Sequence, residues 1–189
     1  MIVYRYGRHA SKGSQSAIRM IFESIFLFAA VALCFSLLQV FVFRVYLIPS
    51  GSMETTVMTD DRIVAEKVSY YFRDVEPSDI VVFEDPEIPG RTLLKRCIAV
   101  EGQTVELQNG EVIVDGKRLV EPYTHGKPTE ELQSDITYPY TVPEGCIWVM
   151  GDNRTNSQDS RYFGAVPVSS VQGHAVFRYW PLSSIGVID

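Results

Sequence analysis

The hydrophobic pattern of this chain falls into two parts. Residues 24–43 form an unbroken run of twenty positions without a formal charge. A helix rises about 1.5 Å per residue, so this run is long enough to cross a hydrocarbon layer about 30 Å thick. Beyond it, apolar residues occur in short, β-branched runs bounded by Asp, Pro or Gly, which is typical of β-strands. The pattern predicts one long helix followed by a β-rich domain.

We expect the long run to be a retained transmembrane anchor over residues 19–43, preceded by a short cytoplasmic segment, residues 1–18. A buried core helix is one alternative, but such helices seldom stay apolar on every face over this length. A cleavable signal peptide is another, but its apolar region is only about 7–15 residues long and ends at a small-residue cleavage site. Here the run continues into Arg44 and further apolar residues.

The basic residues predict the orientation of the anchor. Four of them, Arg5, Arg8, Lys12 and Arg19, precede the run and are opposed only by Glu23. The positive-inside rule therefore places the N-terminus in the cytoplasm and residues 44–189 outside it, in a single-pass protein of the cell membrane.

The outer domain, residues 44–189, holds nearly all the acidic side chains of a chain whose net charge is −6. An acidic domain argues against nucleic acid as a partner, because backbone phosphates require a basic surface. Three cysteines are too few for a disulfide framework. Cys97 and Cys146 both lie in strand-like segments, and they can pair only if those strands are neighbours.

The strand pattern favours an all-β domain, either a partly closed barrel or a folded sheet. Its clearest signal is alternation on both sides of Asn109-Gly110, a dipeptide that tolerates positive φ and forms tight hairpins. Residues 120–140 are polar and aperiodic, which predicts a long surface loop or insertion. The other strand-like segments are residues 62–67, 79–83, 92–100, 146–150 and 174–179.

Three segments carry candidate chemistry. The first is the turn Ser50-Gly51-Ser52, in which Ser52 follows the charge-free run by nine residues, a length that spans at most about 30 Å. Lys95 lies within an apolar strand, where alternation alone also permits it to face solvent, with Arg96 inward. Residues 151–164 form a dense polar loop, which is either a solvated turn or a rigid self-braced segment.

In order and spacing, these segments resemble the boxes of type I signal peptidases. The matching stretches are Pro49-Ser50-Gly51-Ser52-Met53, Ser78 to Phe83, Lys95-Arg96-Cys97-Ile98 and Gly151 to Gly164. These enzymes are membrane-anchored Ser/Lys proteases that remove signal peptides from exported proteins. The short form with one anchor looks like the Gram-positive or cyanobacterial branch.

The resemblance implies a role for each matching residue. Ser52 would be the nucleophile and Lys95 the general base, with Ser50 and the Ser52 backbone N–H forming the oxyanion hole. Ser157 would orient the Lys95 amine, and the other loop residues would support the site. The substrate would be a preprotein with small residues at positions −1 and −3, bound as an added strand beside the lipid bilayer, without cofactor or metal. The supporting residues are Asp152, Asn153, Asp159 and Arg161, and the pocket residues are Ile48, Pro49, Met53 and Leu94.

The chain departs mildly from the family pattern. Thr55 stands where proline is usual, and Cys97, Ala99, Glu101 and Gln103 change the turn that follows Lys95. None of them replaces a proposed catalytic group, so an inactive relative is disfavoured. A non-catalytic adhesion or scaffold module and a self-cleaving repressor-type protease stay open as alternatives, although the anchor and the acidic charge disfavour the second.

Overall fold

The structure is a computed structural model and describes residues 12–188 of the 189-residue chain. It divides into two compact units, Met1–Val40 and Phe41–Asp189. Of the predicted cytoplasmic segment, residues 1–11 lie outside the described residues, as do Arg5, Arg8 and His9.

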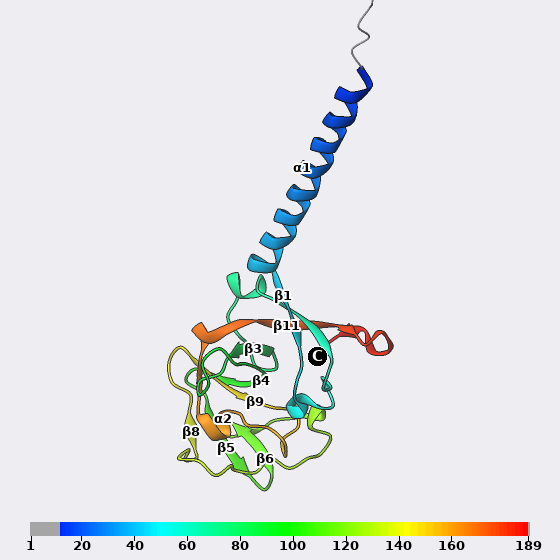
Figure 1. The fold of residues 1–189 in the computed structure, drawn as a ribbon. Helices are drawn as coiled ribbons and strands as arrows, with labels where there is room; N and C mark the ends of the chain where they lie inside the picture. Colours follow the sequence, from blue (N-terminus) through cyan, green and yellow to red (C-terminus); the bar gives the residue numbers. More distant parts are fainter. Residues whose placement is uncertain (1–11, 189) are drawn as a thin grey trace, which may run out of the picture. The chain divides into compact units, whose positions relative to one another are not determined.

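The described residues of the first unit form one helix, α1 (Lys12–Phe41; Figure 1), whose last residue belongs to the second unit. Within the described residues, it is the one helix long and apolar enough to cross a membrane, over Ile18–Gln39. Its large side chains are exposed, with Phe26 at 76% and Phe28 at 78%, so nothing in the described part of the chain covers them. The helix ends two residues before the predicted limit at residue 43, because Phe43 already pairs with Glu66 in a sheet.

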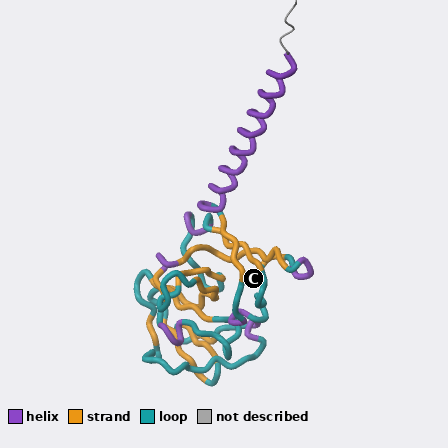
Figure 2. Tube along the Cα trace, viewed as in Figure 1, coloured by secondary structure: helices purple, strands orange, loops and turns teal. Residues whose placement is uncertain are grey.

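The second unit is mainly β, and strands and connecting loops account for most of its backbone (Figure 2). The larger sheet has eight strands in the order β1-β2-β11-β3-β4-β9-β10, with β12 paired to β11. All of its pairings are antiparallel. The strands are β1 (Phe43–Leu47), β2 (Arg62–Glu66), β3 (Ile80–Glu84), β4 (Thr92–Val100), β9 (Cys146–Met150), β10 (Val166–Pro167), β11 (Val171–Trp180) and β12 (Gly186–Val187).

The smaller sheet confirms the hairpin predicted at Asn109-Gly110. The two turn residues have φ values of 52° and 80°, and Gln108 pairs with Glu111 across the turn. The dipeptide therefore supplies the two positive φ angles that a tight hairpin needs. The strand order in this sheet is β7-β6-β5-β8. These strands are β5 (Thr104–Gln108), β6 (Glu111–Val114), β7 (Lys117–Arg118) and β8 (Tyr140–Thr141).

Apolar clusters on both faces of the large sheet hold the domain together. One cluster joins Met53 and Ile48 to Leu94 and Ile63. A second packs Trp148 and Ile98 against the small sheet. Because both faces of β4 are covered, six consecutive residues of that strand, from Leu94 to Ala99, are buried.

Short helices connect the strands and shape the loops around them. The one-turn helices are η1 (Gly51–Met53), η2 (Ser69–Tyr71), η3 (Pro122–Thr124), η4 (Val168–Ser170) and η5 (Leu182–Ser184), and α2 (Ser160–Phe163) is a short α-helix. The β11–β12 hairpin, with η5 at its tip, projects from the domain (Figure 1).

Cys97 and Cys146 are not paired, although their strands β4 and β9 are neighbours. Cys97 lies opposite Val149 in the ladder and packs in a cluster with Phe83. Cys146 packs instead against the cluster around Trp148. The two thiols therefore belong to different packing clusters.

Candidate active site

The candidate nucleophile lies in a 3₁₀ turn that packing holds in place. Ser50 has an extended backbone, with φ −136° and ψ 152°, and the chain then tightens into η1. Met53 is fully buried in the core beside Leu94, which fixes the end of the turn. The hydroxyl oxygens of Ser50 and Ser52 lie 3.5 Å apart. The first N–H groups of a 3₁₀ helix have no partner within the helix, and that of Ser52 is one of them.

Lys95 reaches Ser52 from the neighbouring part of the large sheet. Its Nζ lies 2.6 Å from the Oγ of Ser52, and the side chain is only 2% exposed. The solvent-facing alternative for Lys95 is wrong, because Lys95 and Arg96 are both buried. Alternation assumes one open face, and this sheet has none at β4.

Burial lowers the pKa of Lys95 from 10.5 to about 8, because the charged ammonium loses its hydration. The carboxylates of Asp159 and Asp152 oppose this effect, while the positive charges of Arg161 and Arg91 add to it. The pKa is low enough for a neutral amine to be populated near physiological pH. A neutral amine can accept the proton of a serine hydroxyl.

Arg96, the residue after Lys95, forms a buried ion pair with Asp152. Its Nε and Nη2 donate to the two carboxylate oxygens of Asp152, at 2.9 and 2.8 Å. Thr56, three residues after the nucleophile turn, donates to the same carboxylate at 2.5 Å. The ring of Tyr123 stacks 4.0 Å from the guanidinium carbon. These contacts join β4, the polar loop and the chain after η1.

Asn153 binds the nucleophile turn directly. Its backbone N–H donates to the Ser52 carbonyl at 3.0 Å, and its side-chain amide donates to the Gly51 carbonyl at 2.9 Å. The amide oxygen accepts a hydrogen bond from the Nζ of Lys127 at 2.8 Å. Gly151 permits this close packing, because a Cβ at that position would lie 2.5 Å from the Ser52 carbonyl oxygen.

Asp159 and Arg161 hold the rest of the loop. The guanidinium of Arg161 donates to both carboxylate oxygens of Asp159 at 2.9 Å, and both side chains are buried. Asp159 also accepts from the backbone N–H of Gly151 at 3.0 Å, and Arg161 donates to the Arg154 carbonyl at 2.9 Å.

The expected bond from Ser157 to Lys95 is absent from this structure. The Ser157 hydroxyl is buried and has no hydrogen-bond partner among residues 12–188, while the Lys95 amine is directed to Ser52. The Cβ of Ser157 lies close to Gly151, so the loop places this hydroxyl against backbone instead.

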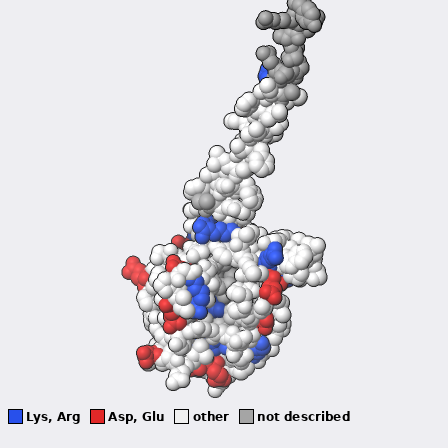
Figure 3. All heavy atoms as spheres, viewed as in Figure 1, with Lys and Arg blue, Asp and Glu red and all other residues white. Residues whose placement is uncertain are grey.

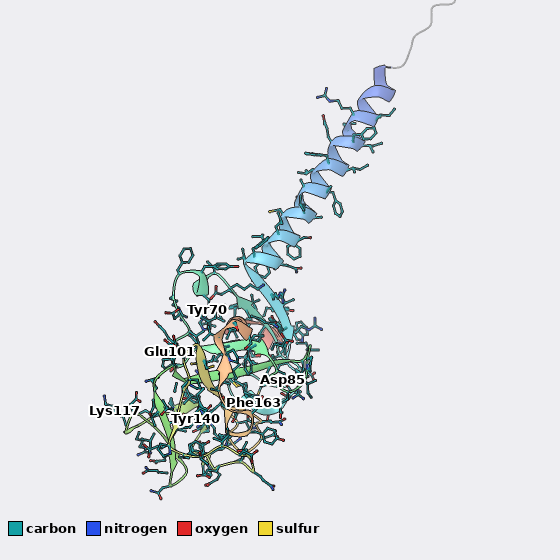
Figure 4. All side chains as sticks on the ribbon, turned by 90° about the vertical axis from the view of Figure 1, so that its left-hand side faces the viewer. Tyr70, Asp85, Glu101, Lys117, Tyr140 and Phe163 are labelled. Atoms are coloured by element: carbon teal, nitrogen blue, oxygen red, sulfur yellow. The ribbon has the colours of Figure 1, made fainter. Side chains whose placement is uncertain are left out.

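A cleft of about 410 Å³ opens beside Ser52 and Lys95. Ile48, Pro49, Met53 and Leu94, the predicted pocket residues, all line it. The polar side chains around the same cleft were not found from the sequence, namely those of Arg91, Asn156 and Gln158. Arg91 pairs with the buried carboxylate of Asp85, which is labelled in Figure 4.

Sequence reasoning also missed the contribution of residues 120–140. Arg154 donates to the carboxylate of Glu121 at 2.6 Å and to the hydroxyl of Thr129 at 2.6 Å. Tyr123, which lies beneath the Arg154 guanidinium, and Lys127, which donates to Asn153, also tie the segment to the polar loop. The segment is therefore not a free surface insertion, and its polar, aperiodic sequence carried no signal of these contacts.

No described histidine takes part in the site. His174, on β11, lies 3.7 Å from Glu66 and 3.6 Å from Asp79. His125 is exposed within the segment 120–140. A buried lysine amine that is hydrogen-bonded to a serine hydroxyl, beside an open apolar cleft, is the arrangement of a serine hydrolase that uses lysine as its base.

Comparison with known proteins identifies the family within this class. The family model described as signal peptidase, peptidase S26, matches residues 19–180. The chain therefore belongs to the signal peptidase family of serine endopeptidases.

Individual relatives agree with this family. A probable signal peptidase I-1 of Synechocystis is 43% identical over 157 residues, which are 79% of this chain and 78% of that protein. A probable thylakoidal processing peptidase 2 of Arabidopsis thaliana is 40% identical, over 75% of this chain and 39% of that longer protein. The signal peptidase I from Enterococcus faecalis, known from a crystal structure, is 34% identical in sequence to this chain. The two structures superpose with a TM-score of 0.48 over 54% of this chain and 97% of the crystallised chain.

Proposed function

We propose that this protein removes signal peptides from preproteins at a membrane surface, with Ser52 as the nucleophile and Lys95 as the general base. The observation that supports this most strongly is the 2.6 Å contact between the Lys95 amine and the Ser52 hydroxyl in a buried site. Serine is a weak nucleophile until a neighbouring base removes its proton.

The lowered pKa makes lysine a usable base. With a pKa of about 8, about one tenth of the amine is neutral at pH 7, against about 0.03% for a lysine at 10.5. Burial therefore raises the population of the reactive form about 300-fold. The amine takes the Ser52 proton during attack on the peptide carbonyl, and the resulting ammonium can return it to the leaving amine.

The oxyanion of the tetrahedral intermediate needs hydrogen-bond donors on the other side of Ser52. The Ser52 backbone N–H and the Ser50 hydroxyl would be these donors, and the Ser50 hydroxyl oxygen lies 3.5 Å from that of Ser52. Removing one such donor typically lowers kcat by about 10²–10³.

The cleft supports binding of an extended substrate with small side chains. Residues 46–50 contribute one part of its lining and residues 91–95 another. Strand β1 is at the end of the sheet order and, among the described strands, pairs with β2 alone, so its outer edge can accept an added strand. Ile48 and Leu94 narrow the cleft with apolar surface, which favours small residues at positions −1 and −3 of the substrate.

Anchoring by α1 would keep Ser52 close to the membrane, because Ser52 follows the charge-free run by only nine residues. The positive-inside rule supports a cytoplasmic N-terminus and an extracytoplasmic domain. Exposed apolar side chains of the β11–β12 hairpin, among them Trp180 at 47% and Leu182 at 69%, would contact the lipid interface.

A cleavage assay tests the proposal. Detergent-solubilised full-length protein is incubated with a preprotein that carries an Ala-x-Ala site, beside Ser52→Ala, Lys95→Ala and the surface control Lys117→Ala. Wild type and control should release the signal peptide, and the two site variants should not. Appreciable cleavage by Ser52→Ala would refute the assignment, and a wild type that never cleaves would favour an adhesion or scaffold module.

A further inference from the structure

A second pocket, of about 480 Å³, lies in the same domain but shares no lining residue with the cleft at Ser52. It is formed by Arg44 at the start of β1, by residues 67–75 around η2, and by residues 168–172, which include η4 and the start of β11. None of these residues belongs to the proposed catalytic machinery.

The pocket is basic, although the domain around it is acidic. Arg44, Lys67 and Arg73 line it, against Asp74 alone among the acidic side chains. Arg73 is held by Asp79, at 2.7 and 3.0 Å. Arg44 is exposed and makes no ion pair with a carboxylate of residues 12–188. Figure 3 shows basic side chains gathered on the edge of the domain where Figure 1 draws the start of β1.

Two of these positive charges are close enough to repel each other. The pKa of Lys67 is lowered, first by partial desolvation and second by the charge of Arg44. Holding like charges together has an electrostatic cost, and a bound anion would remove it.

One residue that lines this pocket, Arg44, is close to the anchor in the sequence. Arg44 follows the last residue of α1 by three positions, which span about 10 Å at most. The segment that lines the pocket also presents exposed apolar and aromatic side chains, Val68 at 37%, Tyr71 at 63% and Phe72 at 86%. Aromatic residues beside basic ones are typical of the zone where lipid headgroups meet water.

We propose that this pocket binds the phosphate of an anionic phospholipid headgroup. Arg44 and Lys67 bind the phosphate, and Tyr71 and Phe72 contact the interface beside it. The inference rests on the proposed membrane anchoring and is independent of cleavage. Free phosphate shares the chemistry, but the acidic domain repels dissolved anions, whereas the anchor keeps lipids at a high local concentration.

The test measures lipid binding to the full-length protein in neutral detergent by native mass spectrometry. Phosphatidylglycerol and phosphatidylcholine are compared, with inorganic phosphate as a competitor. The variant is Arg44→Gln/Lys67→Gln. The matched control, Lys117→Gln/Arg118→Gln, removes the same charge from β7, and Figure 4 shows Lys117 well away from the pocket residue Tyr70.

Wild type should retain phosphatidylglycerol in preference to phosphatidylcholine. The pocket variant should bind it about 30-fold more weakly, since each basic residue near a lipid surface contributes about fivefold. Displacement by millimolar inorganic phosphate would identify a site for the soluble anion, and resistance would identify the lipid. If the double variant does not fold, Arg44→Gln alone should weaken binding about fivefold, because that side chain is exposed.

Equal binding of the two lipids by wild type would overturn the proposal, as would an unchanged pocket variant. An equal loss in the control would also overturn it, because the effect would then be one of net charge. Cleavage of a soluble peptide should be the same in the pocket variant and the wild type, so failure of the lipid site and failure of the proposed catalysis are scored separately.

Discussion

The pH dependence of cleavage should follow the titration of Lys95. With its pKa lowered to about 8, the fraction of neutral amine rises about tenfold per pH unit below that value and levels off above it. The value of kcat/KM for a soluble peptide should therefore climb steeply from pH 6 to pH 8 and flatten towards pH 9. A lysine with an ordinary pKa of about 10.5 would instead give a kcat/KM that still rises about tenfold per pH unit at pH 9.

A single substitution should move this profile in a known direction. The positive charge of Arg91 lowers the pKa of Lys95, so Arg91→Gln should shift the acid limb to higher pH. The side chain of Arg91 is 41% exposed, so solvent screens its charge and the shift should be small. Arg118→Gln removes the same charge from the small sheet and should leave the limb in place.

The assay measures kcat/KM of the detergent-solubilised enzyme between pH 6 and 10, with a substrate peptide that has no group titrating in that range. A limb near pH 8 that moves up in Arg91→Gln supports Lys95 as the base. A limb that lies near 6.5, or that moves down in Arg91→Gln, would point to another titrating group and refute the reasoning.

Four further outcomes are expected. Ser50→Ala should lower kcat by about 10²–10³ with KM little changed, as measured by steady-state kinetics. Lys127→Met should lower kcat by about fivefold, because a part-buried charged hydrogen bond that orients the loop on the nucleophile turn is lost, whereas Lys117→Met should not. Lys95→Met should inactivate the enzyme yet raise its free energy of unfolding by up to about 3 kcal/mol at pH 7. Denaturation curves should show this gain disappearing between pH 8 and 10.5, because in that range the unfolded wild type binds more protons than the folded one and the wild type becomes more stable as the pH rises. Trp180→Ala should weaken liposome binding of the anchorless domain, and unchanged co-sedimentation would contradict that role.

The sequence by itself determined the features that depend on local chemistry. Twenty charge-free positions require an apolar environment on every face, so the long helix could be predicted from length alone. The Asn109-Gly110 turn has few alternatives, because its backbone needs positive φ at both positions. Strands β4 and β9 were predicted with their observed bounds, since Asp, Pro and Gly punctuate them.

Features that depend on partners far along the chain had no local signal. Residues 43–47 look like a continuation of the anchor, and only pairing with β2 makes them a strand. The polar segment 120–140 has the sequence of a surface loop, and its contacts with Arg154 and Asn153 in the folded domain tie it to the site.

The candidate site divides in the same way. The family motifs identified Ser52 and Lys95, but alternation left the direction of the lysine open. Tertiary structure decided it by covering both faces of β4, which buries Lys95 and brings its amine within 2.6 Å of a serine 43 residues earlier. The lowered pKa follows from that burial, because desolvation depends on everything packed around a group and not on its neighbours in the chain.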